Sequence, residues 1–203
     1  MSTLLIKGGR VIDPQNRFDG VSDIWIKDGV VAEVDVGEKP DRTIDARGDV
    51  VMPAGVDIHC HIVGSKVTAG RAMRPEEARR GGGLVRGDAP GSRSGTTGGL
   101  PSTYSTAAQY AGLGYTTAMD AAIAPLGARQ AHLEFADTPF LDKAMFVLLG
   151  NNHYVMKSLR EKDDEQLSGY VAWIVSTAKA LGIKVVNPGG VETWKQGASR
   201  LAG

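Results

Sequence analysis

The sequence is poor in cysteine and carries no excess charge of either sign. Among its 203 residues Cys60 is the single cysteine, so no disulfide bond can form within the chain and a reducing compartment is expected. Its 23 basic residues are balanced by 23 acidic residues, which argues against nucleic acid or an anionic membrane surface as a partner. The single cysteine and the balanced charge together favour a cytoplasmic protein that binds neither nucleic acid nor membrane.

Long apolar runs are missing as well. No run approaches the roughly 20 residues that are needed to cross a bilayer. The first residues lack the basic and apolar regions of a signal peptide, so we expect no secretion leader. What the chain does have is 42% hydrophobic residues, which is enough apolar surface to bury a sizeable core.

Residues 1–54 read as short strands separated by turns. Alternating apolar and polar residues predict strands at 23–27 and 30–34, joined by the strong hairpin signal Asp28-Gly29. Further strands are predicted at 4–7, 10–13 and 43–45. We therefore expect a small antiparallel β unit, which is marginally stable alone and needs a partner surface.

Residues 55–203 alternate between strand and helix patterns. Strands are predicted at 55–61, 115–120, 145–149 and 183–186, and helices at 101–112, 125–136 and 165–181. The glycine-rich stretch 66–99 is predicted to be mostly loop. This repeat implies a parallel sheet with crossover helices, which fits either an open doubly wound sheet or half of an eight-stranded barrel. In both folds the chemistry lies at the C-terminal ends of the strands.

Polar residues gather at those predicted strand ends: His59, His61, Asp120, His153, Lys184 and Asn187. On a regular strand the two histidines of His59-Cys60-His61 share a face with Asp57 and can both reach one divalent metal ion. As a bare pattern, the pair is equally consistent with two ordinary polar residues at a strand end. Cys60 points to the opposite face and is interpreted as a small buried apolar residue.

The segment from Ile44 to His61 resembles the entry strand of the metal-dependent amidohydrolase superfamily; it reads Ile-Asp-Ala-Arg-Gly-Asp-Val-Val-Met-Pro-Ala-Gly-Val-Asp-Ile-His-Cys-His. Within that superfamily, the chain is most similar to the A subunits of formylmethanofuran dehydrogenase and of the related bacterial formyltransferase/hydrolase complex. The closer resemblance rests on the stretches 59–67, 114–123, 150–153 and 183–190.

The resemblance implies a (β/α)₈ TIM barrel with a side β-sandwich. Residues 1–54 would be a portion of the sandwich, and residues 55–203 would be the first four β/α units of the barrel. Such enzymes take two more histidines and a catalytic aspartate from the second half of the barrel. We therefore expect the chain to be a truncated or partial product, incomplete as a catalyst by itself, from an archaeal or bacterial source.

The resemblance also implies a dinuclear zinc site. His59 and His61 would bind one Zn²⁺, and Lys184 would be carboxylated and bridge both ions. Spacing alone would make Lys184 an ordinary strand-end lysine. A protonated lysine repels Zn²⁺, whereas a carbamate offers two anionic oxygens.

The implied reaction is hydrolysis of N-formylmethanofuran to formate and methanofuran, or the reverse condensation, in the one-carbon metabolism of methanogenesis or methylotrophy. Partners would be the methanofuran-type carrier and other subunits of the complex. Two alternatives stay open. One is a cyclic amidohydrolase related to dihydropyrimidinase or dihydroorotase, and the other is a non-catalytic structural subunit.

Several residues are expected to bind substrate or to orient the metal ligands: Asp57, Asp120, Asn152, His153 and Asn187. Arg71 and Arg74 belong to an arginine-rich segment, 66–93, that would attract the acidic tail of the carrier. Contacts to partner subunits and a merely solvated face are rival explanations for that segment. His132 is expected to be a surface or packing residue.

Overall fold

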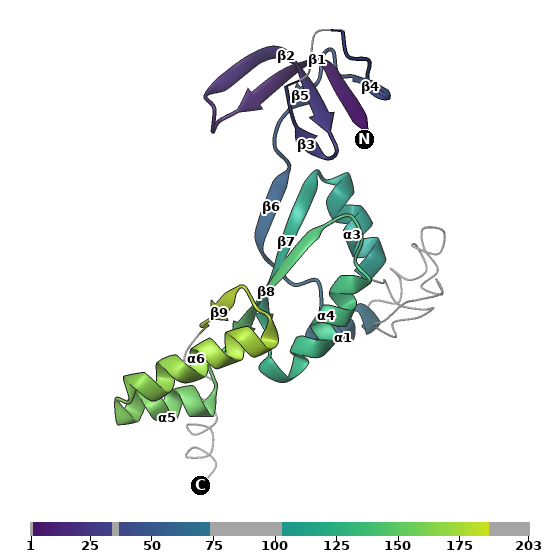
Figure 1. Ribbon diagram of the computed structural model, residues 1–203. Coiled ribbons are helices and arrows are strands. Elements are labelled where there is room, and N and C mark those ends of the chain that lie inside the picture. Colours follow the sequence, from purple (N-terminus) through teal and green to yellow (C-terminus); the bar gives the residue numbers. More distant parts are fainter. Residues whose placement is uncertain (1, 34–36, 74–102, 187–203) are drawn as a thin grey trace. The chain divides into compact units, whose positions relative to one another are not determined.

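The computed structural model describes residues 2–33, 37–73 and 103–186. The chain divides into two compact units, with the boundary between Ala54 and Gly55. Each unit is built around one β-sheet (Figure 1). Among the described residues, no helix is both long enough and apolar enough to span a bilayer.

The first unit is a mixed sheet of five strands. They are β1 (Thr3–Asp13), β2 (Phe18–Lys27), β3 (Val30–Val31), β4 (Arg42–Asp45) and β5 (Val50–Val51). The predicted hairpin joins β2 to β3, and its turn residues Asp28 and Gly29 have positive φ values of 50° and 84°, as a tight hairpin turn requires. However, β4 and β5 pair parallel with β1, so only β1, β2 and β3 form the antiparallel arrangement that we predicted.

Strand β1 joins two predicted strands into one. The pair Gly8-Gly9 looked like a turn in the sequence, but the structure contains a register shift between Ile6 and Gly9 instead. Gly8 has a φ of 73° and donates its backbone N–H to Asp23 Oδ1 at 2.8 Å. A bulge with a glycine in the left-handed conformation bends a strand without ending it.

The second unit contains four parallel strands and their crossover helices. The strands are β6 (Gly55–Cys60), β7 (Tyr115–Ile123), β8 (Asp142–Leu148) and β9 (Gly182–Lys184). The helices are α1 (Ser65–Ala72), α3 (Thr103–Gly112), the 3₁₀ turn η1 (Pro125–Gly127), α4 (Ala128–Ala136), α5 (His153–Glu161) and α6 (Asp164–Ala178). Spatial order follows the sequence, β6-β7-β8-β9, without the reversal that defines a doubly wound sheet. This is the order of a barrel segment.

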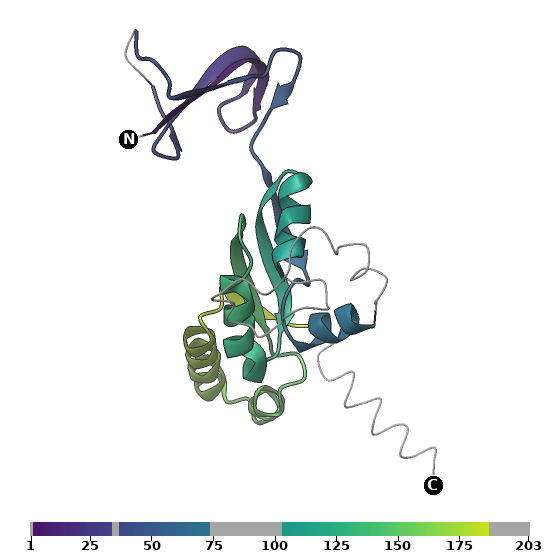
Figure 2. The ribbon, with the colours of Figure 1, turned by 90° about the vertical axis from the view of Figure 1, so that its right-hand side faces the viewer.

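The core of this unit lies between the sheet and its helices. Ala107 of α3, Phe135 of α4 and Ile174 of α6 are buried in one cluster with Ala118 and Met145 of the sheet. Figure 1 shows β6, β7 and β8 running side by side, and the chain leaves their lower ends toward α1, α4 and α5. Figure 2 shows the same strands from the side. All the loops that follow the first three strands therefore leave from one edge of the sheet.

Two of the helices in the described part of the chain were not predicted. Helix α1 begins the stretch that we expected to be loop, and its N-cap, Gly64, offers no capping side chain. Helix α5 begins directly after Asn152, where the sequence suggested only a strand end. The rest of the expected loop, residues 74–99, lies outside the described residues, and so do the first two residues of the helix predicted at 101–112.

Candidate metal centre

The strand that carries the two histidines is irregular at the place where they lie. Its pairing with β7 shifts between Asp57 and Cys60, so side chains no longer alternate strictly there. Asp57 Oδ2 accepts a hydrogen bond from the Tyr110 hydroxyl of α3 at 2.8 Å, and Cys60 is buried in the core that includes α3. Asp57 and Cys60 thus lie on the helix-covered side, while His59 and His61 are exposed.

Asp57 therefore does not share the face of the histidines, and strict alternation was wrong for this strand. Its Oδ1 atom accepts a hydrogen bond from the backbone N–H of His59 at 3.0 Å. That short-range contact stabilises the irregular backbone between the two residues. Burial, together with the hydrogen bond to Asp57, raises the pKa of the Tyr110 hydroxyl, which remains a donor. Asp57 thus contacts His59 through the backbone rather than through the imidazole.

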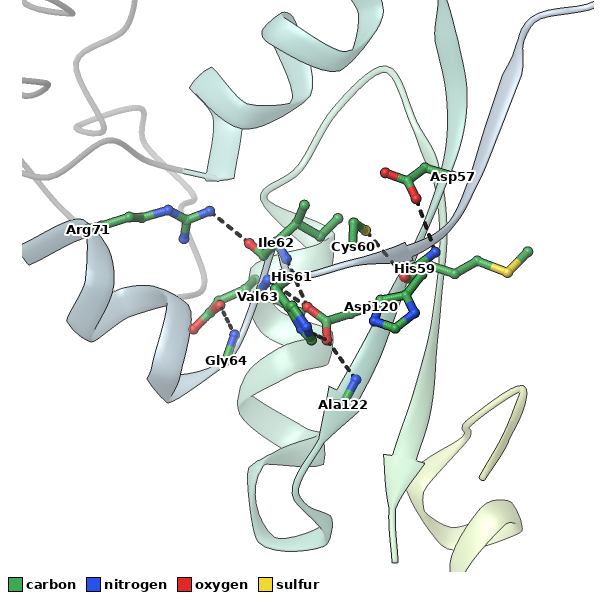
Figure 3. A network of polar contacts seen from close by, with 12 residues as sticks. Asp57, His59, Cys60, His61, Ile62, Val63, Gly64, Arg71, Asp120 and Ala122 are labelled. Atoms are coloured by element: carbon green, nitrogen blue, oxygen red, sulfur yellow. Dashed lines mark hydrogen bonds and ion pairs between the residues drawn. The ribbon is translucent and has the colours of Figure 1, made fainter. Parts of the chain in front are cut away.

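His59 and His61 bring two imidazole rings together at the C-terminal end of β6. The ring centroids are 5.8 Å apart and the ring planes are almost perpendicular, at 89°. Figure 3 shows both rings on one side of the strand and the Asp57 carboxylate on the other. Neutral imidazoles are preferred ligands of Zn²⁺ and similar ions, so this exposed pair fits two ligands of one metal.

The two histidines are not a complete ligand set. Within residues 2–33, 37–73 and 103–186, no group of three or more histidine, cysteine, aspartate or glutamate side chains is placed to hold a metal ion. A structural zinc site needs four ligands and a catalytic site needs three. Any further ligand must therefore be a different residue type or lie outside the described residues.

Cys60, between the histidines, is unsuited to be such a ligand. It is 7% exposed, and its Sγ donates a hydrogen bond to the Met119 carbonyl oxygen at 3.2 Å. Burial raises the pKa of the thiol to about 11, and the nearby Asp57 and Asp120 carboxylates add to this shift. The thiol therefore stays protonated near neutral pH, whereas a metal ligand or a nucleophile would be a thiolate.

Asp120 lies in the neighbouring strand β7, which continues beyond it to Ile123, and it is only 1% exposed. Its Oδ2 atom accepts hydrogen bonds from the backbone N–H groups of Ile62 at 2.8 Å and Val63 at 3.1 Å, and Oδ1 accepts from Ala122 at 3.2 Å. Oδ1 also lies 3.6 Å from Nδ1 of His61 (Figure 3). The carboxylate thus holds the loop that follows the histidines and faces one of their rings.

Glu134 of α4 is a second buried carboxylate near this loop, and the sequence patterns did not single it out. It is 1% exposed, and its Oε2 atom accepts a hydrogen bond from the backbone N–H of Gly64 at 2.6 Å. The available signal was helical spacing. Glu134 follows Ala131 by three residues and precedes Phe135, so it lies on the buried face of α4, where a charged side chain needs polar partners.

Arg71 of α1 binds protein atoms rather than facing solvent. Its Nη2 atom donates to the Ile62 carbonyl oxygen at 2.7 Å and to the Thr106 hydroxyl at 3.0 Å. Burial lowers the pKa of the guanidinium, and the charge of Glu134 opposes that shift. These contacts do not support the carrier-binding role that we predicted for Arg71. Arg74 lies outside the described residues.

Lys184 ends β9, so it lies at the same C-terminal edge of the sheet as the histidines. Two strands, β7 and β8, separate β9 from β6. The Lys184 carbonyl oxygen accepts a hydrogen bond from the backbone N–H of Leu149 at 3.0 Å, which holds this strand end against β8. Asn187, the remaining candidate on this strand, lies outside the described residues.

The candidates that follow β8 have mainly structural contacts. Asn152 Oδ1 accepts from the backbone N–H groups of Tyr154 and Val155 at 3.0 and 3.1 Å, so it caps α5. Its Nδ2 donates to the Tyr170 hydroxyl of α6 at 2.9 Å. His153 is the exposed first residue of α5. The amide of Asn152 thus fixes α5 to α6 instead of facing a ligand.

His132 has the packing role that was expected of it. Its Nε2 lies 2.8 Å from the Ala178 carbonyl oxygen, at the end of α6. Its ring also stacks edge-on with Phe135, with centroids 6.1 Å apart. This histidine joins two helices of the core and is not available to a metal site.

Comparison with known proteins supplies the family. The sequence is 45% identical to Protein FwdA of Methanocaldococcus jannaschii over 194 residues, which cover 95% of this chain and 33% of that protein. It is 38% identical to the A subunit of the formyltransferase/hydrolase complex Fhc of Methylorubrum extorquens over 204 residues, which cover 97% of this chain and 35% of that protein. The chain thus spans about a third of the length of these curated relatives.

A solved structure agrees with the sequence matches. The crystal structure of the formyltransferase/hydrolase complex FhcABCD from Methylorubrum extorquens, in complex with methylofuran, matches 96% of this chain and 35% of the matched chain, with 36% identity and a TM-score of 0.80. This match confirms the predicted fold class, the first half of a TIM barrel preceded by a small β unit. A model of the Amidohydrolase family matches residues 42–201. The chain therefore belongs to the amidohydrolase family, and it is similar to Protein FwdA and to the A subunit of the formyltransferase/hydrolase complex Fhc.

Proposed function

We propose that this chain contributes the first half-barrel of a metal-dependent hydrolase that cleaves the C–N bond of an N-formyl amine on a methanofuran-type carrier. The observation that carries the proposal is the exposed His59–His61 pair at the C-terminal end of the first parallel strand. Similarity along nearly the whole chain to FwdA and to the A subunit of Fhc supports the choice of substrate class.

His59, His61 and, as a carbamate, Lys184 would hold the two zinc ions. When bound, zinc would supply a hydroxide nucleophile near neutral pH and would polarise the formyl oxygen. The imidazoles offer neutral nitrogen donors, and Lys184 would offer anionic oxygens once carboxylated. Cys60, between the histidines, stays protonated and buried, so it does not compete for the metal.

The chain's own residues also keep the ligand loop in place. Asp120 accepts hydrogen bonds from the backbone N–H groups of Ile62 and Val63, and Glu134 accepts one from Gly64. These three residues directly follow His61. The products would be formate and the free amine of the carrier, and the same site would serve the reverse condensation. The partners would be the carrier and further subunits of a cytoplasmic one-carbon complex.

The test uses the purified full-length protein and an N-formylated methanofuran-type carrier. We expect formate release and about two zinc ions per chain, as a two-metal hydrolase requires. The double variant His59→Ala/His61→Ala should lose both. The matched control is His132→Gln, which removes an imidazole from the α4–α6 contact and should keep the full zinc content.

Other outcomes separate the alternatives. If the double variant released formate at the wild-type rate, the assignment of His59 and His61 would fail. If the wild-type protein bound zinc but opened a dihydropyrimidine or dihydroorotate ring in place of the formyl amine, it would be a cyclic amidohydrolase. A wild-type protein without bound metal would be a structural subunit.

A further inference from the structure

The loop that follows the two histidines is held by buried carboxylates from two other elements. Ile62, Val63 and Gly64 connect His61 to α1, and all three are buried. Each of their backbone N–H groups donates to a carboxylate oxygen: those of Ile62 and Val63 to Asp120, and that of Gly64 to Glu134. Three consecutive N–H groups are therefore bound by two charged side chains.

Such burial of charge is costly unless the charge is fully hydrogen-bonded. Asp120 meets this condition with three backbone donors, because Ala122 donates to Oδ1 at 3.2 Å. Glu134 meets it with the Gly64 N–H and with the Gln130 side-chain amide at 3.2 Å, and its charge also acts on Arg71. Arg71 in turn donates to the Ile62 carbonyl oxygen, so donors and acceptors of the loop are both engaged.

Asp120 faces the His61 ring as well as the loop. Its Oδ1 atom lies 3.6 Å from Nδ1 of His61, which is too long for a hydrogen bond but within the range of strong charge–dipole attraction. A carboxylate at that position favours the tautomer that carries its proton on Nδ1. The lone pair is then on Nε2, the nitrogen that remains free to bind a metal. Histidine ligands of metals commonly donate their other ring N–H to a carboxylate in this way.

We propose that Asp120 and Glu134 form a carboxylate clamp on Ile62–Gly64, and that Asp120 selects the His61 tautomer that binds metal through Nε2. The inference rests on the proposed function only in taking His61 to be a metal ligand. Both carboxylates are positioning residues, because they would act on the metal site through His61 and its loop.

The substitution Asp120→Asn separates the two roles of Asp120. Two backbone N–H groups point at Oδ2 and one at Oδ1, so the amide oxygen should take the Oδ2 position and keep the loop in place. The amide NH₂ group would then face Nδ1 of His61 and favour a proton on Nε2. We expect zinc affinity to fall by about 10- to 100-fold, as for other residues that orient metal ligands.

Three measurements on the full-length protein test this expectation. Chelator competition gives the zinc affinity, ¹⁵N shifts of selectively labelled histidine give the His61 tautomer without metal, and hydrogen exchange gives the protection of the Ile62 and Val63 amides. Asp120→Asn should weaken zinc binding and move the proton to Nε2, while both amides stay protected. Asp142→Asn, which alters an exposed carboxylate at the start of β8, is the matched control and should change none of the three.

Glu134 is tested by a pair of variants. Glu134→Ala should speed exchange of the Gly64 amide and weaken zinc binding, and Glu134→Gln, which keeps an acceptor oxygen, should restore both. Wild-type zinc affinity or an unchanged His61 tautomer in Asp120→Asn would overturn the proposal, and so would wild-type exchange in Glu134→Ala. None of these readouts requires formyl hydrolysis, so a failure of the proposed substrate would leave this test intact.

Discussion

Replacing Glu134 by alanine should lower the free energy of unfolding by about 3–5 kcal/mol. Glu134 is 1% exposed, and its Oε2 accepts the Gly64 N–H at 2.6 Å. Alanine leaves that N–H buried without an acceptor, which costs about 1–3 kcal/mol. The loss of the one buried methylene group, Cγ, adds about 0.8 kcal/mol, and the cavity left by the side chain adds more.

Thermal unfolding followed by circular dichroism measures this change. For a chain of this size, 1 kcal/mol shifts the melting temperature by roughly 2–4 °C, so we expect the melting temperature to fall by roughly 6–20 °C. The matched control is Glu161→Ala, which removes an exposed glutamate 3.9 Å from Lys157 on α5 and should cost at most about 0.5 kcal/mol. If Glu134→Ala melted within about 1 °C of the wild type, the buried hydrogen bond would not contribute to stability.

Three further predictions concern the same region. Gly64→Ala should lower the free energy of unfolding by about 1–2 kcal/mol, because Gly64 has a φ of 92° and a new Cβ would lie 3.3 Å from Ile123 Cδ1. Gly70→Ala, where a new Cβ on α1 would meet no neighbouring atom, should raise it by about 0.5–1 kcal/mol. Urea unfolding of both variants measures the two changes. Tyr110→Phe should cost about 0.5–1.5 kcal/mol in the same assay through its lost bond to Asp57; an unchanged midpoint would show that this bond contributes nothing. Burial raises the pKa of Cys60 from 9.0 to about 11, so its contribution to stability is complete below 9.0 and is lost as pH rises toward 11. Iodoacetamide should accordingly modify Cys60 near pH 9 only after unfolding, and rapid modification of the folded protein would contradict this.

Local sequence patterns were sufficient for most of the elements. The Asp28-Gly29 hairpin, the four parallel strands and helices α3, α4 and α6 follow from turn chemistry and hydrophobic periodicity. The strand order that separates a barrel from a doubly wound sheet did not follow from those patterns, because both folds repeat the same strand–helix unit. Resemblance to a known family chose between them, and the structural match confirmed the choice.

The elements that were missed lack a local signal. Helix α1 has no capping side chain and contains Gly70 in its interior, so its propensity is low and its contacts hold it in place. Helix α5 has a cap, Asn152, but the cap looked like a site residue because it follows a strand end. The helix predicted at 165–181 was too long at its C-terminal end, because α6 ends at Ala178, and Leu181, beyond that end, is 59% exposed.

Most contacts around the two histidines could not be predicted from local sequence patterns. The His59–His61 pair was visible as a pattern, but its surroundings come from distant parts of the chain. Asp57 is hydrogen-bonded to Tyr110, which is 53 residues away in the sequence, and Glu134 is hydrogen-bonded to Gly64, which is 70 residues away. Period-two alternation predicted the wrong face for Asp57 because the irregularity in β6 depends on such tertiary contacts.

Anomalous diffraction at the zinc edge, on crystals of the full-length protein, tests the proposed metal centre most directly. We predict an anomalous peak about 2.0–2.1 Å from one ring nitrogen of each of His59 and His61, with Nε2 as the His61 donor, and continuous density from Lys184 Nζ to a carbamate. A crystal in which zinc binds only at sites away from His59 and His61, with no peak between these two side chains at saturating zinc, would contradict the assignment.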